Sequence, residues 1–105
     1  MIDLTKIIDD CSGAGSDWAS DIYAEADQDD RAGNRSIDRI KWGVGDVGDG
    51  AYVTASEACR ANGVKFRDLS DGERDQLISA VCAAAQTEWD RLMRARARQN
   101  QAVTP

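Results

Sequence analysis

The residue types that usually carry chemistry are sparse in this chain of 105 residues. There is no histidine, which excludes nucleophile–histidine pairs and zinc sites that use histidine. The three cysteines are scattered without a C-x-x-C element, which indicates buried thiols in a reducing compartment and not a zinc site. The acid pairs Asp9–Asp10 and Asp29–Asp30 lie in polar stretches that we expect to be exposed, which does not suit acid–base catalysis. We therefore expect no catalytic residue and no metal site.

One glycine-rich stretch matches a cofactor motif by its letters. Residues 43–48 read G-x-G-x-x-G, which in dinucleotide-binding folds brings the backbone close to a pyrophosphate. Here Asp46 and Asp49 would place negative charge beside the phosphates, and the chain is too short for a doubly wound sheet. We interpret the stretch as a plain turn and expect no cofactor. The neighbouring Trp42 is a candidate anchor for a partner protein.

The distribution of charge is more informative. The net charge is −6, but residues 1–30 hold nine acids and one lysine, a local net charge of −8. Such a surface repels nucleic acid and attracts basic protein surfaces, so we expect no direct binding of nucleic acid. The residues that we expect to bind a partner are Asp17, Asp21, Glu25, Asp27, Asp29, Asp30 and Trp42.

The opposite charge gathers near the C-terminus. Residues 91–98 contain no acid and four arginines, of which Arg91, Arg94 and Arg98 share one side of a helix, whereas Arg96 does not. Cations at this position complement the end of a helix dipole. They can also contact an acidic partner, or the acidic surface of the same chain or of a second copy.

A long C-terminal helix over residues 70–99 is the strongest structural signal. Ser70 and Glu73 match the S-x-x-E capping box, and apolar residues then recur every three or four positions. They are Leu77, Ile78, Val81, Cys82, Ala85, Trp89, Leu92 and Met93. We expect residues 1–99 to form a single helical domain around this helix, and residues 100–105 to form a mobile tail.

Two shorter helices are expected at the N-terminus, over residues 2–11 and about 17–28. Between them, Ser12-Gly13-Ala14-Gly15 is typical of a helix breaker, and Ser16 suits the N-cap of the second helix. The two helices should form an antiparallel hairpin with an acidic outer surface.

The middle of the chain is ambiguous. Residues 37–44 suit either a helical turn that follows Ser36 or a strand in which Ile40, Trp42 and Val44 alternate with other residues, and we favour the strand. Residues 51–53 can pair back with it as a hairpin. The predicted fold class is therefore mainly α. It is a small helical domain with one long C-terminal helix, an acidic N-terminal helical hairpin and a possible short β-hairpin in the middle.

Residues 54–69 resemble a helix-turn-helix. Thr54 and Glu57 match a second capping box for a helix over about 55–62, Gly63 suits its C′ position, and Leu69 would lie in the next helix. However, the segment that would read DNA contains many acids, which would face the phosphates. These acids are Asp68, Asp71, Glu73 and Asp75.

In size, acidity and lack of catalytic motifs, the chain resembles the small anti-CRISPR proteins of phages and mobile elements. This resemblance concerns overall character and no motif. It implies a non-catalytic inhibitor or decoy, in the cytoplasm of a bacterial host, that binds a basic nucleic-acid-binding protein such as a CRISPR–Cas effector complex. The alternatives are a small phage structural or assembly protein that self-associates, or a degenerate helix-turn-helix regulator. No apolar run approaches the ~18 residues of a transmembrane helix, so we expect no membrane partner.

Overall fold

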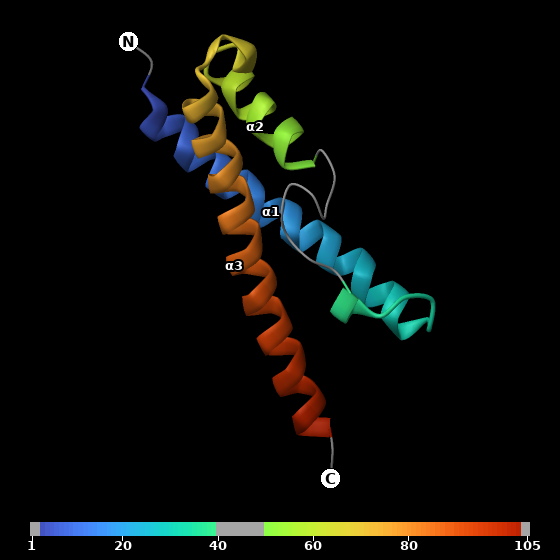
Figure 1. The fold of residues 1–105 in the computed structure, drawn as a ribbon. Coiled ribbons are helices and arrows are strands. Elements are labelled where there is room, and N and C mark those ends of the chain that lie inside the picture. The colour runs from blue at the N-terminus through green and yellow to red at the C-terminus, as the bar shows by residue number, and fades with distance from the viewer. Residues whose placement is uncertain (1–2, 40–49, 104–105) are drawn as a thin grey trace.

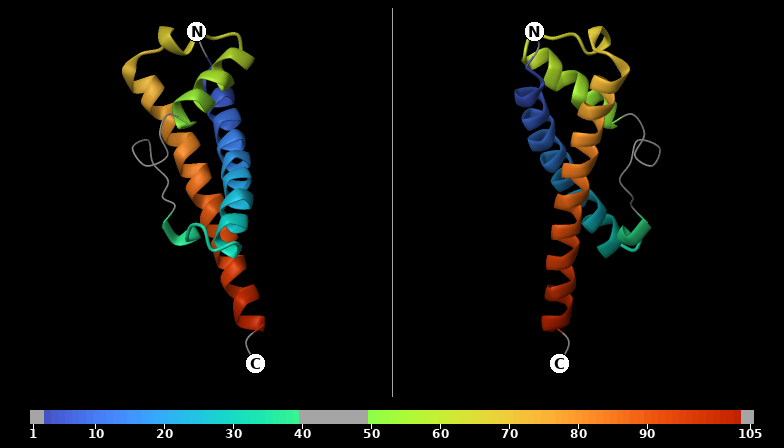
Figure 2. Two further views of the ribbon diagram at one scale, coloured as in Figure 1. Left: turned by 90° about the vertical axis from the view of Figure 1, so that its right-hand side faces the viewer. Right: turned by 60° about the vertical axis from the view of Figure 1, so that its left-hand side comes forward.

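Two long helices that run in the same direction form the frame of the molecule (Figure 1). The computed structural model describes residues 3–39 and 50–103, with side chains up to residue 100. These residues form α1 (Leu4–Arg31), η1 (Ile37–Arg39), α2 (Gly50–Ala61), η2 (Phe66–Asp68) and α3 (Asp71–Val103), where η denotes a 3-10 helix. The described part is all-α and contains no strand. It extends over 59 × 22 × 20 Å, because α3 continues past the end of α1 (Figure 2).

The long C-terminal helix is confirmed, together with its capping box. The Glu73 backbone N–H donates to Ser70 Oγ at 3.2 Å, and the Ser70 N–H donates to Glu73 Oε1 at 2.9 Å. Leu77, Val81, Ala85 and Trp89 are buried, and the other apolar residues of the predicted face are half-buried. The helix ends at Val103, beyond the end that we expected at residue 99.

The predicted N-terminal hairpin is wrong, because residues 4–31 form one continuous helix. Its N-cap is Asp3, whose carboxylate accepts a hydrogen bond from the Thr5 N–H at 3.0 Å. A glycine inside a helix costs about 1 kcal/mol relative to alanine, and here packing against α3 outweighs that cost. A Cβ on Gly15 would lie only 2.4 Å from the carbonyl oxygen of Val81 on α3. Gly15 therefore marks a close approach of the two helices and does not break α1.

The buried residues of the two helices recur every four positions, which gives each helix one narrow contact face. On α1 they include Ile7, Cys11, Gly15 and Ala19, and on α3 they include Leu77, Val81, Ala85 and Trp89. The N-terminal parts of α1 and α3 pack in the main core of the protein. Helix α2 contributes buried alanines and Cys59 to this core, and η2 contributes Phe66. Trp89 belongs to a second cluster with Ala26 and Ile37, farther along α1 and α3.

Helix α2 packs beside the first halves of α1 and α3 and runs in the opposite direction (Figure 1). Residues 51–53 lie inside it, so the hairpin predicted for them is wrong, and Thr54 is not an N-cap. The Thr54 hydroxyl donates to the Gly50 carbonyl at 2.8 Å, and the helix begins where Gly50 lies against Trp18. The end at Gly63 is confirmed: its φ is 73°, and the next N–H, that of Val64, donates to the Cys59 carbonyl at 2.9 Å.

The connections differ from both the strand and the helix-turn-helix interpretation. Residues 37–39 form the turn η1, whose Asp38 N–H donates to Ser36 Oγ at 3.3 Å, so the helical alternative holds there. Leu69 lies between η2 and α3, outside the helix in which the helix-turn-helix resemblance places it. Residues 40–49, which include Trp42 and the glycine motif, lie outside the described part of the chain.

Candidate interaction surface

A row of four acids follows one side of α1, and we call it the acidic stripe: Asp17, Asp21, Glu25 and Asp29. All four residues are exposed. Positions four apart on a helix lie one above the other, about 6 Å apart along the axis, so the stripe is about 18 Å long. Within the described residues no hydrogen bond or ion pair engages these four carboxylates. The stripe is therefore open to a partner.

The stripe has a cost for its own helix. Like charges four residues apart destabilise a helix by about 0.2–0.5 kcal/mol per pair. Asp17, Asp21, Glu25 and Asp29 form three such consecutive pairs, with no cation between them on that side of the helix. The repulsion decreases when a basic surface covers the stripe, so the stripe favours complexes with cations.

Asp27 and Asp30, which we also expected to bind a partner, contact α3. Arg96 donates from Nε to Asp27 Oδ1 and from Nη2 to Asp30 Oδ1, both at 3.1 Å. The Arg96 and Asp27 side chains are only 19% and 21% exposed. We call this arrangement the Arg96 latch. Arg96 therefore contacts the acidic helix of its own chain, which is one of the roles that we considered for the arginines.

The latch changes the titration of Asp27. Partial burial raises the pKa of Asp27, but hydrogen bonds from Arg96 and Arg31 outweigh that effect and leave the pKa below its usual value. The same hydrogen bond from Arg96 to Asp27 raises the pKa of the guanidinium. Asp30 has a second structural role, because its Oδ2 accepts a hydrogen bond from the Ile37 N–H at 2.8 Å and so holds η1 on α1. These two acids stabilise the fold, and their carboxylates are engaged.

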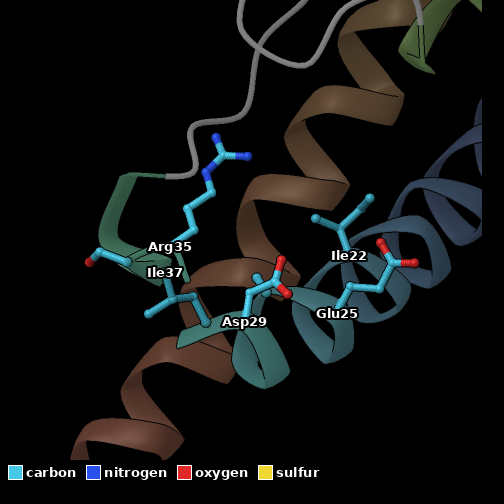
Figure 3. Close-up of a pocket in the computed structure, with 7 residues that line it drawn as sticks. Ile22, Glu25, Asp29, Arg35 and Ile37 are labelled. Carbon is cyan, nitrogen blue, oxygen red and sulfur yellow. The ribbon is translucent and has the colours of Figure 1, made fainter. Parts of the chain in front are cut away.

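A pocket of about 160 Å³ lies beside the acidic stripe, between α1 and the segment that leads into η1 (Figure 3). Ile22, Ala26 and Ile37 supply its apolar lining. Glu25 and Asp29 reach it from α1, and Arg35 reaches it from the opposite side. This volume accommodates about one side chain of a partner, with carboxylates close by.

Sequence reasoning missed two features of this surface. It considered Ile37 only as part of an ambiguous segment, whereas Ile37 is 1% exposed and links η1 to the cluster around Trp89. It also assigned Asp27 and Asp30 to the same surface as the stripe. The helical spacing contained a signal for the latch, because Arg96 lies on a different side of α3 from Arg91, Arg94 and Arg98. Trp42, the remaining predicted residue, lies outside the described part of the chain.

Carboxylates and thiols are among the side chains of this chain that could bind a metal ion or act as nucleophiles. No group of three or more His, Cys, Asp or Glu residues in the described part of the chain is placed to hold a metal ion. Burial, with smaller effects of Cys59 and Asp10, raises the pKa of the Cys11 thiol to about 11, so this thiol is protonated at neutral pH. Burial also raises the pKa values of Cys59 and Cys82. A thiol that stays protonated is a poor nucleophile.

Comparisons with known proteins identify no relative: no family model, no curated protein and no solved structure matches the chain. Among the described residues, no helix is both long enough and apolar enough to cross a membrane.

Proposed function

We propose that the protein is a non-catalytic inhibitor that binds the nucleic-acid-binding surface of a partner protein through its acidic stripe. The observation that carries this proposal is the set of four exposed carboxylates, one helical turn apart, without partners in the described chain. The resemblance in size and acidity to anti-CRISPR proteins indicates the class of partner, a CRISPR–Cas surveillance complex.

The spacing of charge sets the kind of mimicry that the stripe can provide. The stripe presents one negative charge per about 6 Å, whereas a nucleic-acid strand presents one per about 3.4 Å. The stripe therefore imitates the sign and the line of the charge and does not replace each phosphate. Such a surface gives fast association that weakens as salt rises. Nucleic acid, with its higher charge density, should compete for the same surface.

The pocket beside the stripe adds a contribution that salt does not screen. An aliphatic side chain, or the stem of a lysine or arginine, gains about 1.5–3 kcal/mol when it is fully buried on apolar residues. Ile22, Ala26 and Ile37 offer such a lining next to Glu25 and Asp29. The partner surface that fits best is therefore basic, with one side chain that projects into the pocket.

The test is an electrophoretic mobility-shift assay in which a purified CRISPR–Cas surveillance complex binds its target DNA in the presence of the protein. The wild type should reduce DNA binding, more strongly at about 50 mM salt than at about 300 mM. The variant Asp21→Lys/Glu25→Lys should lose at least tenfold in inhibition.

The matched control is Glu57→Lys/Asp75→Lys, which makes the same change of net charge at two other exposed acids on α2 and α3. This control should inhibit nearly as well as the wild type. Equal inhibition by both double variants would contradict a role of the stripe, and no inhibition by the wild type would exclude this class of partner.

A further inference from the structure

A second charged surface lies away from the stripe, where α2 leads through η2 into α3. A groove of about 470 Å³ opens there, and we call it the basic groove. Its lining residues are Tyr52, Ser56, Arg60, Val64, Lys65, Phe66 and Arg67. Three of these carry a positive charge and none carries a negative one, although the chain as a whole has a net charge of −6.

The three cations of the groove are not used by the described part of the fold. Arg60, Lys65 and Arg67 make no side-chain hydrogen bond or ion pair there. Arg74 and Arg91, by contrast, pair with acids on their own helix, and Arg96 forms the latch. The groove also has an ordered aromatic wall, because Tyr52 packs edge-to-face on buried Phe66 with ring centroids 4.8 Å apart, yet stays 48% exposed.

We propose that the basic groove binds the acidic stripe of a second copy of this chain. The two surfaces are complementary in sign and similar in charge: three cations meet four carboxylates that have no partner in the described chain. A nucleic-acid strand of the same ~18 Å length carries about five charges, so three cations would neutralise it less completely. The exposed face of Tyr52 and the neighbouring Val53, which is 50% exposed, add apolar area to the contact.

The contact allows two kinds of assembly. In a two-fold dimer, the stripe of each copy lies in the groove of the other. If each copy instead uses its stripe on one neighbour and its groove on another, the contacts are heterologous and form open chains unless the rotation closes a ring. Self-association also covers the stripe, and it would therefore compete with the partner in the proposed function. The contact itself does not depend on the identity of that partner.

Sedimentation velocity of the purified protein tests this contact. At about 50 mM salt the sedimentation coefficient should increase with protein concentration, and at about 500 mM salt the apparent dissociation constant should rise at least tenfold. The groove variant is Arg60→Glu/Lys65→Glu/Arg67→Glu, and the stripe variant is Asp17→Lys/Asp21→Lys/Glu25→Lys/Asp29→Lys. Each variant alone should remain monomeric.

Mixing the two variants is the decisive measurement. The lysine stripe of one variant then meets the glutamate groove of the other, and the unchanged groove of the first meets the unchanged stripe of the second. The mixture should therefore associate again, which a misfolded variant cannot do. Circular dichroism checks the helix content of each. A wild type that is monomeric at every concentration in low salt, or a mixture that stays monomeric while both variants are folded, would overturn the proposal. So would a labelled single-stranded oligonucleotide that binds the wild type but not the groove variant.

Discussion

Gly13 and Gly15 lie two residues apart on α1 and face different surroundings. A Cβ on Gly15 would collide with the backbone of α3, whereas a Cβ on Gly13 would meet, within 4 Å, no atom of the described chain beyond its own stretch of helix backbone. The acids farther along the helix divide in the same way. Asp27 and Asp30 face α3 and bind Arg96, while Asp29 belongs to the exposed stripe.

The inward and outward faces of α1 thus use the same residue types for different purposes. On the inward face, small size permits the close approach to α3 and negative charge holds the latch. On the outward face the acids destabilise the helix slightly and remain open to a partner. The role of an acid in this protein depends on what lies opposite it. Substitutions on the inward face, at the arginine that binds it and on the outward face test this difference.

The largest difference is expected for alanine at the two glycines. Gly15→Ala should destabilise the protein by about 2 kcal/mol or more, because the helices must separate or distort to admit the methyl group. Gly13→Ala should stabilise it by about 0.5–1 kcal/mol, because alanine favours the helix and nothing obstructs it. Urea unfolding followed by circular dichroism measures both. The same sign for both variants would contradict the close approach at Gly15.

This pair also shows what the sequence could and could not predict. The long C-terminal helix was predictable because its capping box and apolar periodicity lie within one segment. Gly13 and Gly15 look alike in the sequence, and only their relation to Val81, more than sixty positions away, distinguishes them. The sequence analysis therefore missed the continuous α1. The helix continues through both glycines because the packing of two long helices outweighs the local preference of glycine for turns.

The candidate site was predictable in charge but not in arrangement. Once residues 4–31 form one helix, spacing alone places Asp17, Asp21, Glu25 and Asp29 in a row. The engagement of Asp27 and Asp30 depends on Arg96, and the pocket depends on where η1 returns to α1. Both are long-range features that no local pattern specifies.

The second pair of substitutions compares two arginines on α3. Arg96→Met should destabilise the protein by about 1–2 kcal/mol, because it leaves the half-buried carboxylates of Asp27 and Asp30 without their shared donor. Arg94→Met, at an exposed position, should change the stability by less than about 0.5 kcal/mol. Thermal and urea unfolding would show the difference. Equal effects would mean that the latch contributes nothing beyond an ordinary surface charge.

The latch should also make stability depend on pH in a defined window. The folded-state pKa of Asp27 lies below the ordinary value of 3.8, so its contribution is complete above about pH 5 and is lost as the pH falls through 3.8 and then through the lowered pKa. The destabilisation caused by Asp27→Asn, roughly 1 kcal/mol at neutral pH, should therefore shrink as the pH falls below about 5.

The destabilisation caused by Asp27→Asn is measured by urea unfolding between pH 7 and pH 2, once in the wild type and once in the Arg96→Met variant. Because hydrogen bonds from both Arg96 and Arg31 lower the pKa, this pH dependence should decrease in the Arg96→Met background, and the part that remains is due to Arg31. A difference that grows as the pH falls would have the wrong sign for a depressed pKa.

The smallest effect, and the one that links stability to function, is expected on the outward face. Asp21→Asn removes two like-charge pairs, with Asp17 and Glu25, and should stabilise the protein by about 0.5 kcal/mol at low salt. The gain should fade at about 0.5 M salt, where exposed charges are screened. Glu57→Gln is the control, since no acid lies three or four positions from it. Asp21→Asn should also weaken inhibition in the mobility-shift assay. A residue whose replacement raises stability but lowers inhibition serves binding and not the fold. A loss of stability on this substitution would show instead that the stripe supports the fold.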